Sequence, residues 1–240
     1  MIYSDQKRGM LLAFTAVLFI TPDSLFIRLA NINSWNLIFY RGFIPFSIVL
    51  VSLLLFYKSN FIKQTFSNGW HGVAYAFIFT ITNITFVISI ENTNVANTLI
   101  MIALAPMLSA VLSFIFLKEI PDKKTWSAIF ITTLSVIYIF YDAMDTGDIL
   151  GNALGLLTAF GLAVGAVIIR SAKKINLVPS AMFGKLLVAL IAFYFADDLL
   201  LRNFGSNFFN WKNDMIIVPL MCVMCVAIPF VLVTIAPRYI

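Results

Sequence analysis

The sequence predicts an all-α polytopic membrane protein with eight transmembrane helices. Of its 240 residues, 61% are hydrophobic and only 11% are charged, and the mean hydropathy is +0.97. These values lie outside the range of a water-soluble globular domain. A spanning helix needs about 20 mostly apolar residues, so eight such windows take roughly 160 positions and leave about 80 for the tails and the seven connections. No soluble domain is predicted.

The first four windows each end where polar or charged residues begin. Lys7 and Arg8 precede the first window, but no small-residue cleavage site follows it, so we expect a retained span and not a secretory signal. In chain order the four windows are Gly9–Ile27, Trp35–Tyr57, Trp70–Ile90 and Val95–Leu117.

The next four windows follow the same rule. They are Thr125–Tyr141, Ile149–Ile169, Leu177–Leu200 and Met215–Ala236. Cys222 and Cys225 lie inside the last window, where a Cys-x-x-Cys pair lacks the polar flanks of a redox or zinc site. We interpret both cysteines as packing residues, and we predict no metal site and no cofactor.

The cations predict the orientation of the chain, because loops rich in Lys and Arg face the cytoplasm. One side carries Lys7, Arg8, Lys58, Lys63, Lys118, Lys123, Lys124, Arg170, Lys173, Lys174 and Arg238. The other side carries only Arg28, Arg202 and Lys212. We therefore expect a cytoplasmic N-terminus. The net charge of +5 is explained by these cytoplasmic cations, so nucleic acid is not a predicted partner.

An internal repeat is visible in the sequence. Residues 9–28 align without gaps with residues 151–170, and both segments end in arginine. Further on, Arg41 falls opposite Lys185. The two copies begin five spans apart, so the second enters the membrane from the opposite face. An inverted repeat is the architecture of secondary transporters that work by alternating access.

The second copy is shorter than the first. In the alignment Ile240 corresponds to Thr98, before any counterpart of the windows at 95–117 and 125–141. We expect a truncated or partial sequence, and a shortened paralogue is the alternative.

Three segments carry a resemblance to a known family. They are Thr21-Pro22-Asp23-Ser24-Leu25-Phe26-Ile27-Arg28-Leu29, Phe39-Tyr40-Arg41-Gly42, and the pattern Asn97-Thr98, Ala105-Pro106 and Phe116-Leu117-Lys118-Glu119. With them the chain resembles the EamA-type transporters of the drug/metabolite transporter superfamily, ten-helix proteins built from two five-helix repeats. The resemblance implies that residues 1–141 form the first EamA-like repeat and residues 149–240 an incomplete second repeat of three helices. It also implies a small-molecule transporter of the cytoplasmic (inner) membrane.

Two charged residues lie at membrane depth on neighbouring spans. Arg41 and Asp23 fall at one level, and a charge at this depth normally faces a cavity or a partner. One interpretation is a structural ion pair. The other places Arg41 in the substrate pathway, with Asp23 modulating it. Proton coupling through Asp23 and facilitated diffusion are both consistent with the sequence.

Lys185 is the repeat counterpart of Arg41, and it either faces the same cavity or extends its ammonium to the inner membrane surface. If both cations face a cavity with Asp23, the local charge is +1. That balance favours an anionic or zwitterionic substrate over a cationic drug.

Four further residues are candidates for the transport machinery. Pro22 and Pro106 interrupt helices and are candidate hinges or simple kinks. Asn83 would hydrogen-bond the substrate or, equally, another helix. Glu119 follows the fourth window and is interpreted as a gate or helix-end contact, or as a solvated loop charge.

These observations predict a secondary transporter of a small, amino acid-like anionic or zwitterionic metabolite, working by alternating access and with export as one direction. A non-transporting membrane scaffold and a non-functional truncated paralogue are the alternatives. An enzyme is not predicted, because the single histidine, His71, has no catalytic partners in the sequence. The glycines at 151, 155, 161 and 165 favour close helix packing, within the bundle or across a homodimer.

Overall fold

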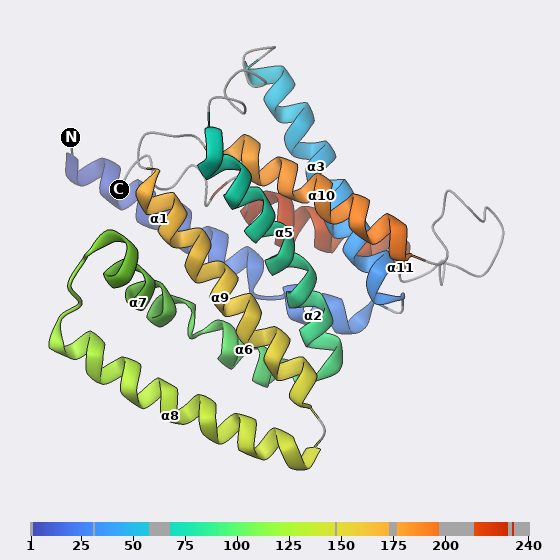
Figure 1. Ribbon diagram of the computed structural model, residues 1–240. Helices are drawn as coiled ribbons and strands as arrows, with labels where there is room; N and C mark the ends of the chain where they lie inside the picture. The colour runs from blue at the N-terminus through green and yellow to red at the C-terminus, as the bar shows by residue number, and fades with distance from the viewer. Residues whose placement is uncertain are drawn as a thin grey trace. The chain divides into compact units, whose positions relative to one another are not determined.

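The structure is a computed structural model that describes residues 2–30, 32–57, 68–146, 148–172, 177–196, 214–229 and 232. These residues are helical apart from short connections and contain no strand, which confirms the all-α fold (Figure 1). Among them, seven helical stretches are long and apolar enough to cross a membrane. A shorter apolar helix, Ile216–Ala227, lies in the eighth predicted window.

Some predictions fall on residues outside the described part of the chain. They are the end of the seventh window at 197–200, residues 230, 231 and 233–236 of the eighth window, and the loop cations Lys58, Lys63, Lys173, Lys174, Arg202, Lys212 and Arg238.

The chain divides into two compact units. The first unit contains Met1–Ser67 and Asn176–Ile240, and the second contains Asn68–Ile175. Each unit therefore combines helices from both predicted sequence repeats. The boundaries between the two packed units are not the boundary between the two repeats. The repeats at 1–141 and 149–240 remain a prediction.

Helices of the first unit come from the two ends of the chain. They are α1 (Ile2–Ile20), α2 (Asp23–Leu29), α3 (Ser34–Tyr57), α10 (Val178–Phe195), α11 (Asp214–Met221) and the π-helical segment Cys222–Ala227. The first predicted window is thus two helices, with a break at Thr21 and Pro22. Pro22 lacks an N–H to continue the α1 hydrogen bonds, and its ring clashes with the preceding turn.

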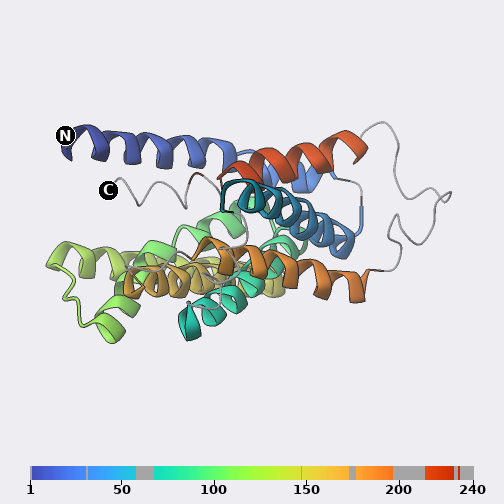
Figure 2. The same ribbon diagram turned by 90° about the horizontal axis from the view of Figure 1, so that it is seen from above.

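α3 and α10 form the main helix pair of the first unit and lie against each other in both views (Figure 1, Figure 2). Gly42 makes this approach possible, because a Cβ atom there would lie 2.7 Å from the Ala189 nitrogen and 2.8 Å from the Lys185 carbonyl oxygen. At one end of the pair, Trp35 stacks on Phe195 with ring centroids 4.7 Å apart. The two helices are therefore fixed closely together along α3.

The second unit contains α5 (Gly69–Asn92), α6 (Val95–Ile102), α7 (Ala105–Leu117), α8 (Lys123–Thr146) and α9 (Ile149–Ser171). The fourth predicted window is broken between α6 and α7, just ahead of Pro106. Pro106 cannot donate to the carbonyl of Ile102 four residues earlier, and its ring clashes with that carbonyl. α6 accordingly ends at Ile102.

α5 and α9 form the most extensive helix pair of the second unit. A Cβ atom on Gly151 would lie 2.5 Å from the carbonyl carbon of Asn92, and one on Gly155 would lie 3.0 Å from the Ser89 hydroxyl. A Cβ atom on Gly161 would overlap the Thr82 hydroxyl. These glycines of α9 therefore serve packing within the chain, which decides between the two predicted roles for them.

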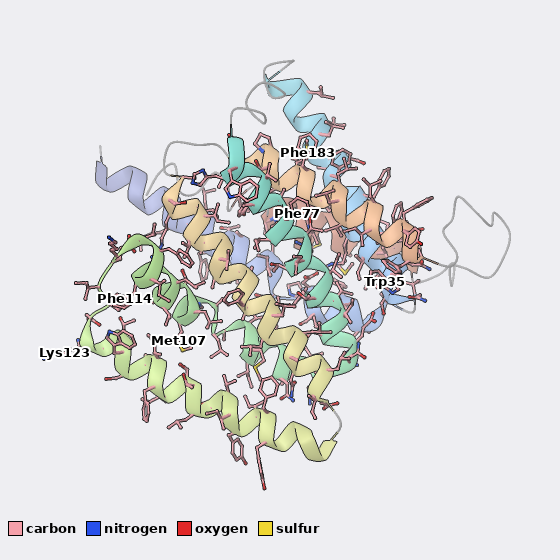
Figure 3. All side chains as sticks on the ribbon, in the orientation of Figure 1. Trp35, Phe77, Met107, Phe114, Lys123 and Phe183 are labelled. Atoms are coloured by element: carbon pink, nitrogen blue, oxygen red, sulfur yellow. The ribbon has the colours of Figure 1, made fainter. Side chains whose placement is uncertain are left out.

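α8 lies on the outside of the second unit, along α7 and α9. The Thr132 hydroxyl contacts the sulfur of Met107, and Phe114 meets Trp126 edge to face with centroids 6.0 Å apart. Figure 3 labels Met107 and Phe114 of α7 and Lys123 at the start of α8. The opposite side of α8 exposes large apolar side chains, which suits contact with lipid. They include Phe130, Ile131, Leu134 and Tyr138.

Candidate functional site

A buried ion pair joins α2 to α3 in the first unit. Arg41 donates from Nη1 to Asp23 Oδ1 at 2.5 Å and from Nη2 to Asp23 Oδ2 at 2.8 Å. The side chains of Arg41 and Asp23 are only 6% and 7% exposed. Each carboxylate oxygen thus has its own guanidinium nitrogen, the two-pronged arrangement that Arg forms with carboxylates. The sequence prediction that the two residues meet at one level is confirmed.

Lys185 is the third buried charge of this unit. It lies on α10, is 3% exposed, and interacts electrostatically with both Arg41 and Asp23. This burial among charges fits the interpretation in which Lys185 faces a cavity with Asp23 and Arg41, and that interpretation stays a prediction. Asp23, Arg41 and Lys185 together form what we call the charged cluster, and their formal charges sum to +1.

Sulfur-containing side chains border the charged cluster. The Met221 sulfur lies 3.6 Å from Arg41 Nη1, and the buried thiol of Cys222 interacts electrostatically with Arg41 and Lys185. Cys222 and Cys225 are both free and buried, in agreement with a packing role. Met221 and Cys222 were not predicted to lie beside the charges, because hydropathy alone marks them as ordinary apolar residues.

The segment Cys222–Ala227, which follows α11, is π-helical. Segments of π-helix are uncommon and are found frequently at functional sites. This segment packs on α3, the helix that carries Arg41. No residue pattern in the sequence predicts it.

The predicted residues of the second unit have local partners. Asn83 is half-buried, and its Nδ2 donates to the Phe79 carbonyl at 2.7 Å within α5. Glu119 Oε2 accepts from Arg170 Nη1 at 3.3 Å, and the same nitrogen donates to the Ser113 hydroxyl at 3.2 Å. Glu119 thus contacts Arg170 between the end of α7 and the end of α9, and both side chains are about half exposed. Its role as a gate or helix-end contact stays a prediction.

The model of the EamA-like transporter family matches residues 7–141. The chain belongs to this family. The matched segment contains Asp23, Arg41, Asn83, Pro106 and Glu119. No curated protein and no solved structure matched.

Membership in the EamA-like family makes the chain a membrane transporter of the drug/metabolite transporter superfamily. The family implies that the chain lies in a lipid bilayer and acts on a small-molecule substrate. Members of the family are transporters and not enzymes.

Proposed function

We propose that this EamA-family protein moves a small anionic or zwitterionic metabolite across the cytoplasmic membrane by alternating access. The charged cluster is the part of the substrate pathway that recognises the substrate. The observation that carries this proposal is the burial of two cations with one anion in the first unit. A substrate that brings one negative charge would balance them.

The energetic cost of these charges supports a functional role. Moving a charged group out of water costs several kcal/mol, and a buried ion pair repays this only with good geometry and further hydrogen bonds. Apolar residues of similar volume would hold α2, α3 and α10 together as well or better. A cluster retained at this cost is a candidate for recognition, and the charge balance sets the sign of the ligand.

Two helix breaks supply candidate hinges for alternating access. α2 is separated from α1 at Pro22, and α7 is separated from α6 ahead of Pro106. The contact of Glu119 with Arg170 is a candidate gate, because it is half-exposed and joins two helix ends. In this proposal the N-terminus is cytoplasmic, Asn83 lines the pathway, and protonation of Asp23 couples transport to a proton gradient.

Uptake into proteoliposomes tests the proposed function. The full chain is reconstituted, and a panel of labelled anions, zwitterions and cations is offered to wild-type, Arg41→Ala, Lys185→Ala and Asn83→Ala proteins. We expect uptake of anions or zwitterions that is lost in the two cation variants. Arg28→Ala is the matched control, because Arg28 is an exposed arginine at the end of α2. Unchanged uptake in both cation variants would defeat the proposal.

A further inference from the structure

We propose that the guanidinium of Arg41 is a carboxylate-binding subsite that Asp23 occupies in this structure, and that a substrate carboxylate binds there by replacing Asp23. This inference rests on the proposed transport function and names the chemical group recognised. It makes Asp23 an internal competitor of the substrate and not only a modulator of it.

The geometry of the pair is that of ligand recognition. Arg41 offers two terminal nitrogens side by side, and Asp23 covers both of them with its two oxygens. An external carboxylate has the same planar shape, the same charge and the same spacing of oxygens. It can therefore take the place of Asp23 without any change in the guanidinium.

The two partners differ in how firmly the chain holds them. Arg41 lies inside the 24-residue helix α3, next to Gly42, where α3 is packed directly on the backbone of α10. Asp23 is the first residue of α2, which has only seven residues and follows the break at Pro22. No side-chain hydrogen bond caps the start of α2. Asp23 is therefore the partner held less firmly by the chain, and we place the movement that withdraws it in α2, which packs on α11.

The surroundings of Arg41 favour a monoanion. Lys185 adds a second buried cation, so the cluster attracts a carboxylate even while Asp23 stays nearby. On the other side, Met221 presents a thioether sulfur to Arg41 Nη1. A thioether has no hydrogen to donate, so it cannot bind the additional oxygens of a phosphate.

Chemical rescue of Asp23→Ala tests the proposal. Thermal unfolding of the detergent-solubilised full chain is followed with sodium acetate, acetamide, sodium phosphate or sodium chloride at matched ionic strength. We expect acetate to raise the unfolding temperature of the variant with an apparent Kd roughly tenfold or more below that for the wild type, where Asp23 competes. Acetamide and chloride should have no such effect, and phosphate should act more weakly than acetate.

Two further variants keep the test decisive. Asp23→Asn preserves the size of the side chain and shows the same preference for acetate if the alanine variant does not fold. Asp23→Ala combined with Arg41→Leu should lose the rescue, which assigns the acetate to Arg41. Equal effects of acetate on wild type and variants, or a stronger effect of phosphate, would overturn the proposal.

The rescue experiment is independent of transport. If acetate rescues Asp23→Ala but no substrate is moved in proteoliposomes, the subsite stands and the proposed function fails. If transport depends on Arg41 but acetate gives no rescue in a folded variant, the proposed function stands and the exchange of carboxylates fails.

Discussion

The two units of this protein bury polar groups of different kinds. Among the described residues, the first unit buries the three charges of Asp23, Arg41 and Lys185. The buried polar side chains of the second unit are neutral, mainly Thr, Ser and Asn. A neutral hydroxyl is cheap to bury when it is hydrogen-bonded, whereas a charge is costly even when paired. In the proposed function the costly buried charges of the first unit recognise the substrate, whereas the buried hydroxyls of the second unit join its helices.

The hydroxyls of the second unit form hydrogen bonds between helices. Thr85 and Thr158 lie 2.8 Å apart between their hydroxyl oxygens, and Thr93 donates to Asn152 Oδ1 at 2.9 Å. Ser89 donates to the Gly151 carbonyl at 2.7 Å. Because these bonds run along the contact of α5 with α9, they hold the two helices in one register. We call the contact of α5 with α9, together with the hydroxyls that line it, the frame of the second unit.

The largest expected effect is that of removing Arg41. Arg41→Ala leaves the Asp23 carboxylate buried without its guanidinium, which typically costs about 3–5 kcal/mol of stability. We expect a marked fall in unfolding temperature together with loss of transport. A chain that unfolds at the wild-type temperature would contradict the burial of the pair.

A double variant separates stability from transport. Asp23→Leu with Arg41→Leu replaces the pair by apolar side chains, a change that is often neutral or stabilising. Stability should recover while transport stays lost. If transport also recovers, the pair is structural, and the comparison between the units no longer holds.

The next largest effect is expected from a substitution at the contact of α5 with α9. In Gly151→Ala the added methyl group meets the Asn92 carbonyl at 2.5 Å, and overpacking of this kind costs about 1–3 kcal/mol. Gly165→Ala is the matched control on the same helix, because its nearest neighbour, a Tyr75 ring carbon, lies at 3.6 Å. The control should be neutral or slightly stabilising. Denaturation of the two variants in parallel checks this, and equal stabilities would disagree with the close packing of α5 on α9.

A smaller effect is expected from Ser89→Ala. This change removes the bonds from Ser89 to the Gly151 carbonyl and to the Thr98 hydroxyl, and each hydrogen bond typically contributes about 1 kcal/mol. Transport per folded molecule should be unchanged, since Ser89 belongs to the frame. Ser135→Ala, which removes an exposed hydroxyl on α8, is the control. A loss of transport without a loss of stability would move Ser89 from the frame to the pathway.

The smallest effect is expected at Asp122, which precedes α8. Its carboxylate accepts from the Thr125 backbone N–H at 2.8 Å and from the Thr125 hydroxyl at 3.0 Å. These hydrogen bonds lower the pKa of Asp122 below its ordinary value. The stabilisation is therefore complete above the unfolded-state pKa, about 3.9, and is lost as the pH falls through the folded-state pKa.

Unfolding measured from acidic to neutral pH tests this sign. Asp122→Ala should be less stable than the wild type at neutral pH, and the two proteins should converge in acid. A difference that grows as the pH falls would contradict the assignment of Asp122 as the cap of α8.

The helices and the meeting of Asp23 with Arg41 could be predicted from the sequence because both depend on local signals. Long apolar windows mark the spans, and the depth of Arg41 and Asp23 within them is enough to predict that the two meet. The break at Pro22 also has a local cause. The start of α8 at Lys123, two residues before the predicted window, follows from the cap at Asp122.

Other features depend on packing between segments that are far apart in the chain, and they could not be predicted from a single sequence. Lys185 has two physically reasonable positions, and only the packing of α10 on α3 decides that it is buried. The proximity of Met221 to Arg41 joins residues 180 positions apart. Likewise, the hydrogen bonds between the side chains of α5 and α9 can be identified only when the relative position of the two helices is known.

Anion uptake by Lys185→Gln tests the central claim most directly. This variant removes the charge of Lys185 and leaves the Asp23–Arg41 pair intact, so the fold should be preserved. Our account predicts a wild-type unfolding temperature and a loss of anion uptake of roughly tenfold or more, the equivalent of about 1.4 kcal/mol. Undiminished anion uptake by the folded variant would contradict the claim that the charged cluster recognises the substrate.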